Sequence, residues 1–558
     1  MNSLVVAGIA VFLLLLGYIF YSRKVKEWVG LDDNEVPPAV AMNDGVDYVP
    51  AKHWTILFGH HFASIAGAAP VIGPVIACLY WGWLPAVIWI VAGGILFGAV
   101  HDFTALVLSL KHSGKSITTI TESVMGKTSK IIFSVFAFLS LILIVAVFAA
   151  VAGKTLATTP EVVVPTFGLV AVAFVIGFLM YRMQYPVLIC SIAGLLLLVG
   201  LIVAGYHFPV RLPFANEDTA ARWWTVILLF YGMVASVTPV TLLLQPRDHL
   251  AGAVLYLGMF FGFLGLIITR PEMKAPGIVA FSSKMGWMWP MLFVNIACGA
   301  ISGFHSLVAS GTTSKQIPRM RDARVIGYGA MIMESALAIL AVMAVSAGLY
   351  WKSAPAGIEG PVYQELFNKG GWIKAFGTGY GELTKLFFGG LGTLIGITML
   401  KTFIMTTLDT ATRITRYLCN ELLGETFRIP CMKNKYAATL LVGVLAGALA
   451  LGNWKAIWPV FGAANQLIAS LVLIVASVYL FTHRRSFLFT AVPAVIMLVT
   501  TIGALIYNTY IFATAEKPNI MLAVIDVMLI ILAIFLAYTA LMTVGRARRN
   551  ISGGPQGN

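Results

Sequence analysis

The stretch that decides the fold is FGHHFASIAGAAPVIGPVIA, which runs from Phe58 to Ala77. It is apolar, yet it holds two adjacent histidines, a cluster of Gly and Ala, and prolines at positions 70 and 74. Proline removes a backbone donor and disrupts the helical turn that precedes it. Freed backbone groups at membrane depth are tolerated only where they line a cavity or are buried in protein. The stretch therefore predicts an interrupted membrane helix, although a simple kinked packing helix is the alternative.

The composition is that of an integral membrane protein. The 558 residues are 59% hydrophobic and 11% charged, and the mean hydropathy is +0.89, whereas soluble domains carry about 25% charged residues. The net charge of +14 comes from short basic runs between apolar segments, which is typical of membrane topology signals rather than of a nucleic-acid partner. The five cysteines show no paired spacing, so neither a disulfide framework nor a metal site is predicted.

About fifteen apolar stretches are candidates for membrane spans, and the basic connectors fall on one side if the N-terminus is outside and the C-terminus is cytoplasmic. We expect an all-α protein in six parts. These are an N-terminal span (1–21), an acidic cytoplasmic loop (22–54), a core (55–411), a basic cytoplasmic loop (412–435), four further spans (436–543) and a cytoplasmic tail (544–558).

Two similar segments suggest an internal repeat. GAAPVIGPVIA (67–77) and ASVTPVTLLLQP (235–246) both combine small residues with two prolines, and they lie five expected spans apart. That spacing predicts a five-plus-five inverted repeat, with units of about 55–206 and 224–411 that each begin with a broken helix. We expect the substrate between the breaks at 66–71 and 236–240, with the lining residues His60, His61, Ser64, Gly67, Ala68, Pro70, Ser236, Thr238 and Pro239.

Ionisable side chains inside the spans are few, and each costs about 2.5–3.5 kcal/mol on insertion. They are His60, His61, His101, Asp102, His305, Glu334 and Asp409. We expect Asp102, together with His101, to carry a coupling proton, with Glu334 and Asp409 as the next candidates. Asp409 has an alternative, structural role, because Arg413 follows one helical turn later.

Hydroxyl groups cluster in HSLVASGTTSKQ (305–316). Ser306, Ser310 and Thr313, near His305, would form a cation site if Na⁺ replaces H⁺ as the coupling ion. The same hydroxyls are equally suited to joining helices to one another.

A second class of function is a membrane-embedded haem or metal redox protein, or a nutrient sensor, because four intramembrane histidines accompany Asp and Glu. The histidine spacings show no metal-binding box and no haem attachment motif. We therefore expect no enzyme and no cofactor beyond H⁺ or Na⁺. The expected partners are a small-molecule substrate and the lipid bilayer.

Several longer segments resemble the carbon starvation protein A (CstA) family, in order, from about residue 40 to 480. They are NDGVDYVPAKHWTILFGHHFASIAGAAPVIGPVIA, WLPAVIWIVAGGILFGAVHDFTALVLSLKHSGKSI, QPRDHL, SGFHSLVASGTTSKQ, TTLDTATRITRYL and WPVFGAANQLIA. The resemblance implies a LeuT-like fold of the amino acid–polyamine–organocation superfamily, in a bacterial inner membrane. It also implies peptide uptake during carbon starvation, or pyruvate/proton symport as in close relatives.

Two positions depart from the family pattern. His101 stands where long members commonly carry Gln, and Lys401 lies where Glu often precedes the TT-D run. The chain is also shorter at its C-terminal end than the long enterobacterial members. We expect a secondary active, proton-coupled importer of pyruvate or short peptides, with the substrate and the coupling ion left open.

Overall fold

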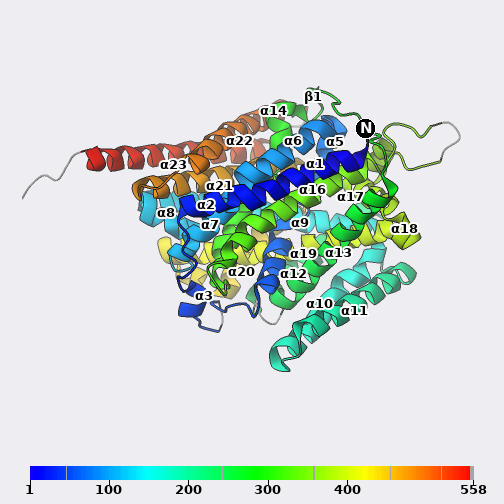
Figure 1. Cartoon of the computed structure of the whole chain (residues 1–558), viewed down its shortest axis with the longest axis horizontal. Coiled ribbons are helices and arrows are strands. Elements are labelled where there is room, and N and C mark those ends of the chain that lie inside the picture. Colours follow the sequence, from blue (N-terminus) through cyan, green and yellow to red (C-terminus); the bar gives the residue numbers. More distant parts are fainter. Residues whose placement is uncertain (46, 240–242, 356–358, 453, 517, 553–558) are drawn as a thin grey trace, which may run out of the picture.

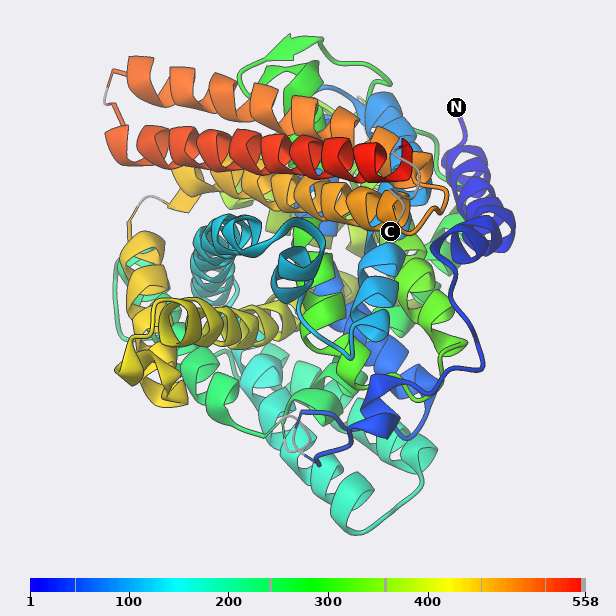
Figure 2. The same ribbon diagram turned by 90° about the vertical axis from the view of Figure 1, so that its left-hand side faces the viewer.

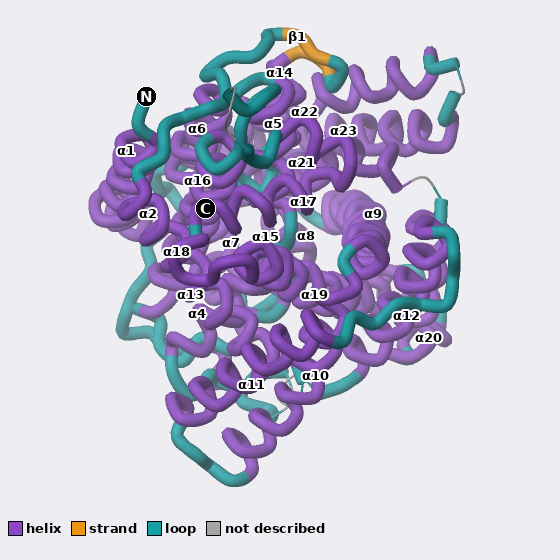
Figure 3. Tube along the Cα trace, turned by 90° about the vertical axis from the view of Figure 1, so that its right-hand side faces the viewer, coloured by secondary structure: helices purple, strands orange, loops and turns teal. Residues whose placement is uncertain are grey.

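The computed structural model describes residues 1–45, 47–239, 243–355, 359–452, 454–516 and 518–552, and it is almost entirely helical (Figures 1 and 3). A single small hairpin of β1 (Ser282–Ser283) and β2 (Gly286–Trp287) is described outside the helices. Within these ranges, twelve helices are long and apolar enough to cross a membrane, or thirteen if one bent pair counts as a span. The all-α membrane fold is thereby confirmed, but the expected count of fifteen is not established.

The first span runs further than expected. The first span continues through a π-helical turn into α2, so the acidic loop begins after Val29 rather than after residue 21. The helices are α1 (Ser3–Leu16), α2 (Ser22–Val29), α3 (Pro38–Ala41), α4 (Trp54–Ala66), α5 (Ala69–Tyr80), α6 (Trp83–Gly93), α7 (Ala99–Lys111), α8 (Ile117–Met125), α9 (Lys127–Thr158), α10 (Val163–Gly177), α11 (Val187–His207), α12 (Glu217–Val237) and α13 (Leu244–Thr269).

In the second half, α19 continues eight residues past the expected end of the core at 411, to Cys419. Its extra turns stay helical because Arg413 and Arg416 are buried against protein rather than placed in a loop. The helices are α14 (Met288–Asn295), α15 (Gly303–Gly311), α16 (Ala330–Ser346), α17 (Tyr363–Leu383), α18 (Lys385–Phe388), α19 (Gly392–Cys419), α20 (Lys435–Ala450), α21 (Trp454–Thr482), α22 (Leu488–Thr514) and α23 (Ile520–Ser552).

The predicted interruption at 66–71 is present. Helices α4 and α5 meet at an angle of 41°, and Gly67 between them adopts φ +51° and ψ −152°. A side chain is strained in that conformation, and a Cβ atom on Gly67 would lie 2.9 Å from Thr407 Oγ1. Pro70 occupies the first turn of α5, where a missing N–H does no harm.

The second interruption is not where the sequence predicted it. Pro239 follows the end of α12, and Pro246 lies in the first turn of α13, so these prolines mark a connection between two helices. Residue 240, within the predicted break, lies outside the described residues. The second interrupted helix is the 288–311 segment, which breaks over 296–302, between α14 and α15.

The two interrupted helices make equivalent contacts with the rest of the bundle, which indicates an internal repeat. Helix α4 packs against α13 as α14 packs against α21, and α5 packs against α16 as α15 packs against α7. Helices α8 and α17 stand in equivalent places, against α9 and α19. The contacts indicate repeat units of about 54–269 and 288–482, and in the described part of the chain α22 and α23 follow this core, packed along α21 (Figure 2).

The units indicated by the contacts differ from the predicted units of about 55–206 and 224–411, because the first unit contains an inserted pair of helices. Helices α10 and α11 form a hairpin at the edge of the bundle (Figures 1 and 3). Along the chain, the hairpin stands between α9 and α12 of the core. Counting five spans from the first break therefore ends at α12 rather than at the second interrupted helix.

The conformation at Gly67 is open to a direct test. Gly67→Ala should destabilise the protein by about 1–3 kcal/mol, because alanine cannot adopt this backbone conformation without strain. The thermal unfolding midpoint of the detergent-purified protein measures the effect. Gly200→Ala, in α11, is the matched control because a Cβ atom there meets nothing within 4 Å. Equal unfolding midpoints for Gly67→Ala and Gly200→Ala would contradict the strained backbone conformation at Gly67.

Candidate functional site

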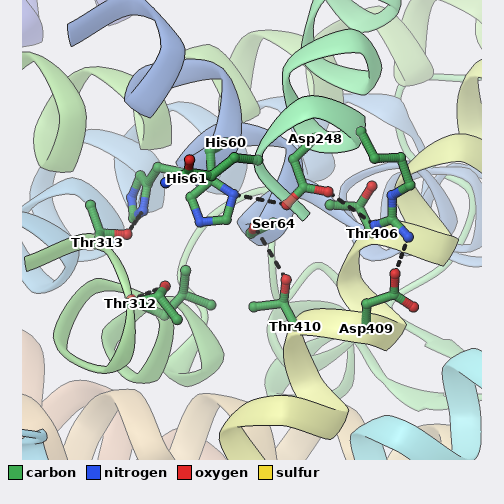
Figure 4. A network of polar contacts seen from close by, with 12 residues as sticks. His60, His61, Ser64, Asp248, Thr312, Thr313, Thr406, Asp409 and Thr410 are labelled. Atoms are coloured by element: carbon green, nitrogen blue, oxygen red, sulfur yellow. Dashed lines mark hydrogen bonds and ion pairs between the residues drawn. The ribbon is translucent and has the colours of Figure 1, made fainter. Parts of the chain in front are cut away.

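A chain of buried charges lies beside the first interruption (Figure 4). His60 Nδ1 lies 2.8 Å from Asp248 Oδ2, and Arg247 Nη2 donates to Asp248 Oδ1 at 3.0 Å. The Nη1 atom of Arg247 also donates to Asp409 Oδ2. We call His60, Arg247, Asp248 and Asp409, together with Tyr231, the arginine network.

Tyr231 closes the network from α12. Its hydroxyl donates to Asp409 Oδ2 at 2.9 Å and accepts from Arg247 Nη1 at 2.7 Å. The network thus joins α4, α12, α13 and α19, and its four ionisable members His60, Arg247, Asp248 and Asp409 are at most 1% exposed. An arginine and two carboxylates at this depth are stable only as a mutually paired set.

The sequence analysis missed two central members of this network. Arg247 and Asp248 follow Pro246 in the first turn of α13. The available signal was an Arg–Asp pair inside a long, otherwise apolar region. The predicted partner of Asp409 was also wrong, because Arg413 donates instead to the backbone oxygens of Ala235 and Thr238.

The predicted substrate residues divide into two groups. On α4, Ser64 Oγ lies 3.4 Å from Thr410 Oγ1, and Thr407 Oγ1 donates to the Ser64 carbonyl at 3.3 Å. Gly67, Ala68 and Pro70 form the interruption itself. Ser64 and the interruption are therefore joined to α19.

Ser236, Thr238 and Pro239 form the other group, at the end of α12. The Thr238 hydroxyl donates to the Val234 carbonyl one turn back, and Pro239 is exposed. Ser236 is buried, and its hydroxyl has no hydrogen-bond partner in the described part of the chain. No described hydrogen bond connects these three residues to the interruption at Gly67, since they mark a helix end rather than a second break.

His61 lies between the arginine network and a second cluster. Its Nδ1 atom is 2.8 Å from Thr313 Oγ1, and the preceding residue, His60, belongs to the arginine network. Its Nε2 atom has no partner among the described side chains. His61 therefore has hydrogen-bonding capacity left for a ligand, as does Ser236.

The second cluster is centred on Asp102, and we call it the acid–histidine cluster. Its carboxylate oxygens are 2.7 Å from His101 Nδ1 and 2.8 Å from His305 Nδ1. The Nε2 atom of His305 lies 3.4 Å from Glu334 Oε2. The four residues come from α7, α15 and α16, and all are fully buried. The structure therefore assembles the predicted coupling residues, except Asp409, which belongs to the arginine network.

The predicted cation site is not assembled from free hydroxyls. Ser306 and Ser310 each donate to a backbone oxygen of α15 at 2.7 Å, and Thr313 contacts His61. Elsewhere, one ligand atom each of Cys298, His305 and Glu334 falls within 4.8 Å of the others. Among the described residues, this is the one group of three that could hold a metal ion.

The acidic loop is ordered over one end of the site. Val49 and Ala51 donate their N–H groups to the carbonyls of Lys315 and Gln316 at 3.1 and 3.0 Å. The Gln316 side chain in turn contacts His60 Nε2 at 3.5 Å. We call residues 47–51 the strap. The strap and the arginine network are therefore in contact through Gln316.

Tyr48 anchors the strap by donating to the Ser113 carbonyl at 3.0 Å. Burial, assisted by the charges of Asp47 and Asp44, raises the pKa of Tyr48 above its usual value of 10.0, so the phenol keeps its donor proton at any physiological pH. Beside it, a cavity of about 280 Å³ lies between α8, α15 and α19, and its lining includes Asp47, Lys315 and Glu421.

Comparison with known proteins assigns the chain to a family. The family model described as carbon starvation protein CstA matches residues 2–367 and 361–504. The chain belongs to the CstA family. It is 35% identical to the pyruvate/proton symporter BtsT of Escherichia coli K12, over 90% of this chain and 81% of that protein. It is 32% identical to the peptide transporter CstA of the same strain, over 90% of this chain and 80% of the relative.

A more distant relative is aligned over almost its full length. The peptide transporter CstA of Bacillus subtilis is 28% identical over 97% of this chain and 96% of the relative. Among solved structures, a mutant of the Eremococcus coleocola manganese transporter matches with a TM-score of 0.50 at 11% identity, over 91% of this chain and 99% of that one. This likeness concerns the fold alone and agrees with the LeuT-like arrangement. The relatives are transporters, which does not favour the redox or sensor alternative.

The arginine network predicts a stability pattern. Arg247→Met should cost about 3–5 kcal/mol, because it leaves buried carboxylates without their cation. The double variant Arg247→Met/Asp409→Asn should be more stable than the single one, since it removes a stranded charge. Thermal unfolding of the purified proteins measures both. Lys369→Met, which breaks an exposed pair with Glu365, should change stability by less than about 1 kcal/mol. A double variant no more stable than Arg247→Met would contradict the pairing.

Proposed function

We propose that this protein is a proton-coupled importer of small carboxylates, with pyruvate as the leading candidate and short peptides as the second. Support comes from the family, from the relatives named for pyruvate/proton symport and peptide transport, and from the two interrupted helices that meet polar side chains inside the bundle. We further propose a bacterial inner-membrane location, with the N-terminus outside and the C-terminus cytoplasmic.

The proposal of proton coupling rests on the net charge of the arginine network. Two carboxylates, Asp248 and Asp409, surround one guanidinium, so the set has one net negative charge when His60 is neutral. A net charge buried in low-dielectric surroundings is costly. One proton held between His60 and the two carboxylates makes the set neutral, and its arrival and departure would accompany the transport cycle.

Neighbouring charges do not replace that proton. Arg413, one turn along α19 from Asp409, directs its Nη2 atom to two backbone oxygens. Lys401, two turns away in the other direction, donates to the Ala152 carbonyl at 2.7 Å. Neither cation is paired with a carboxylate of the network in the described structure.

The carboxylate preference follows from the interruption. Helix α5 begins at Ala69, so its N-terminal end faces the break with a partial positive charge. His61 Nε2 is available as a hydrogen-bonding atom from the same segment. Together they suit a carboxylate group, which pyruvate and the C-terminal end of a peptide both present.

Uptake into proteoliposomes tests the substrate assignment. With an inward proton gradient, labelled pyruvate should accumulate, and unlabelled pyruvate should compete better than di- and tripeptides. Replacing both His60 and His61 with Gln should reduce pyruvate affinity at least tenfold. Peptide uptake without pyruvate uptake would move the assignment to the second candidate, and wild-type affinity in the double variant would assign both histidines to packing.

Charge-removing variants test the coupling residues. Asp248→Asn should abolish uptake driven by a proton gradient yet keep pyruvate counterflow, because the network no longer needs to exchange its proton. Asp102→Asn tests the sequence-derived carrier in the same two assays, and Glu365→Gln on the surface is the control. Gradient-driven uptake at the wild-type rate in Asp248→Asn would remove the arginine network from the coupling step.

A further inference from the structure

An apolar groove lies away from the two polar clusters. It has a volume of about 800 Å³ and runs between α1, α4, α13 and α16. Figure 1 shows α1 lying across α16 on this side of the bundle. The groove walls include Gly8 and Val11 of α1, Phe58 of α4, Phe263 of α13 and Met333 of α16. Apart from α4, which belongs to the bent pair, these walls are candidate membrane spans, so the groove lies at the depth of lipid acyl chains.

A basic pocket adjoins the groove where α1 continues into α2. It has a volume of about 620 Å³, and its lining includes Arg23, Lys26, Glu27 and Arg324. Lys26 is paired with Asp33 at 2.5 Å. Arg23 and Arg324 are therefore the cations that we assign to a ligand at this pocket.

The groove and the pocket are continuous through two residues. Tyr18 lines the groove, and the Arg324 guanidinium lies over its ring, 5.3 Å from the centroid. Arg324 Nη1 also donates to Ser22 Oγ at 3.0 Å, which fixes the guanidinium at the mouth of the groove. Val325, the next residue in the chain, lines the groove. An amphipathic ligand could therefore occupy both cavities at once.

We infer that the groove and the basic pocket together bind one anionic phospholipid. Its acyl chains lie between α1, α4, α13 and α16, and its phosphate is held by Arg23 and Arg324. Guanidinium groups match phosphate oxygens in two-point geometry, and basic pockets beside membrane helices recognise anionic headgroups. The charge of the pocket selects an anionic lipid over a zwitterionic one, and the apolar groove excludes a free phosphate as the main ligand.

The site has a connection to the polar clusters through α4. Trp54, Thr55 and Phe58 line the groove, and His60 and His61 follow on the same helix. A bound acyl chain thus packs against the helix that carries the histidines. Lipid binding itself can be measured without transport, so its test is independent of the proposed function.

Two variants separate the parts of the site. Arg23→Gln/Arg324→Gln removes the phosphate partners, with Arg321→Gln/Arg428→Gln as a control that removes the same charge from exposed positions. Gly8→Phe fills the groove, and the substitution should be tolerated because a Cβ atom on Gly8 meets nothing within 4 Å. Val11→Phe is a second groove-filling variant in case Gly8→Phe does not fold.

The measurement is phosphatidylglycerol binding to the detergent-purified full chain, by native mass spectrometry and thermal shift. Phosphatidylcholine and inorganic phosphate serve as comparison probes. We expect one tightly bound phosphatidylglycerol, at least tenfold weaker binding in the double arginine variant, no change in the control variant, and loss of the bound lipid in the groove-filling variants.

Several outcomes would overturn the inference. They are equal affinity for phosphatidylglycerol and phosphatidylcholine, undiminished binding in the double arginine variant, or stabilisation by inorganic phosphate alone to the same extent. A dimer that covers α1 and leaves no bound lipid would assign the groove to a second copy of the chain instead.

Discussion

The polar groups of this protein must be satisfied inside the protein, because hydrocarbon offers no hydrogen-bond partner. The second interruption illustrates the consequence. Helix α15 starts in mid-bundle, and the side-chain oxygen of Asn465, on α21, accepts from the Phe304 N–H at 2.9 Å. The same amide donates to Ser302 Oγ at 2.9 Å. A helix can begin at this depth only because another helix supplies its cap.

The first interruption depends on α19 in the same manner. Thr407 of α19 donates to the Ser64 carbonyl at the end of α4, and Asp409, two residues on, holds Arg247 of α13. A single turn of α19 therefore satisfies a broken backbone and a buried cation. The shared helix ties the first interruption to the arginine network.

Much of this arrangement was predictable from the sequence where the signal is local. The glycine and proline residues at 67–74 predicted the first break because both act on their own backbone. The cost of burying charge singled out His101, Asp102, His305 and Glu334 as functional candidates but did not predict their mutual contacts. The second break has no proline between Met291 and Gly311, and its cap comes from Asn465, more than 150 residues away. The partner of Asp409 was equally non-local. It is Arg247 of another helix, α13, whereas Arg413, which is nearer in sequence, donates to backbone oxygens.

The strap has a consequence for how the interior can be reached. It is bonded to the carbonyls of Lys315 and Gln316, and the Gln316 side chain contacts His60. Lifting the strap either breaks both backbone bonds or moves Gln316 away from the histidine. If the two backbone bonds hold, opening the protein at the strap also separates Gln316 from His60, so the position of the strap is coupled to the arginine network.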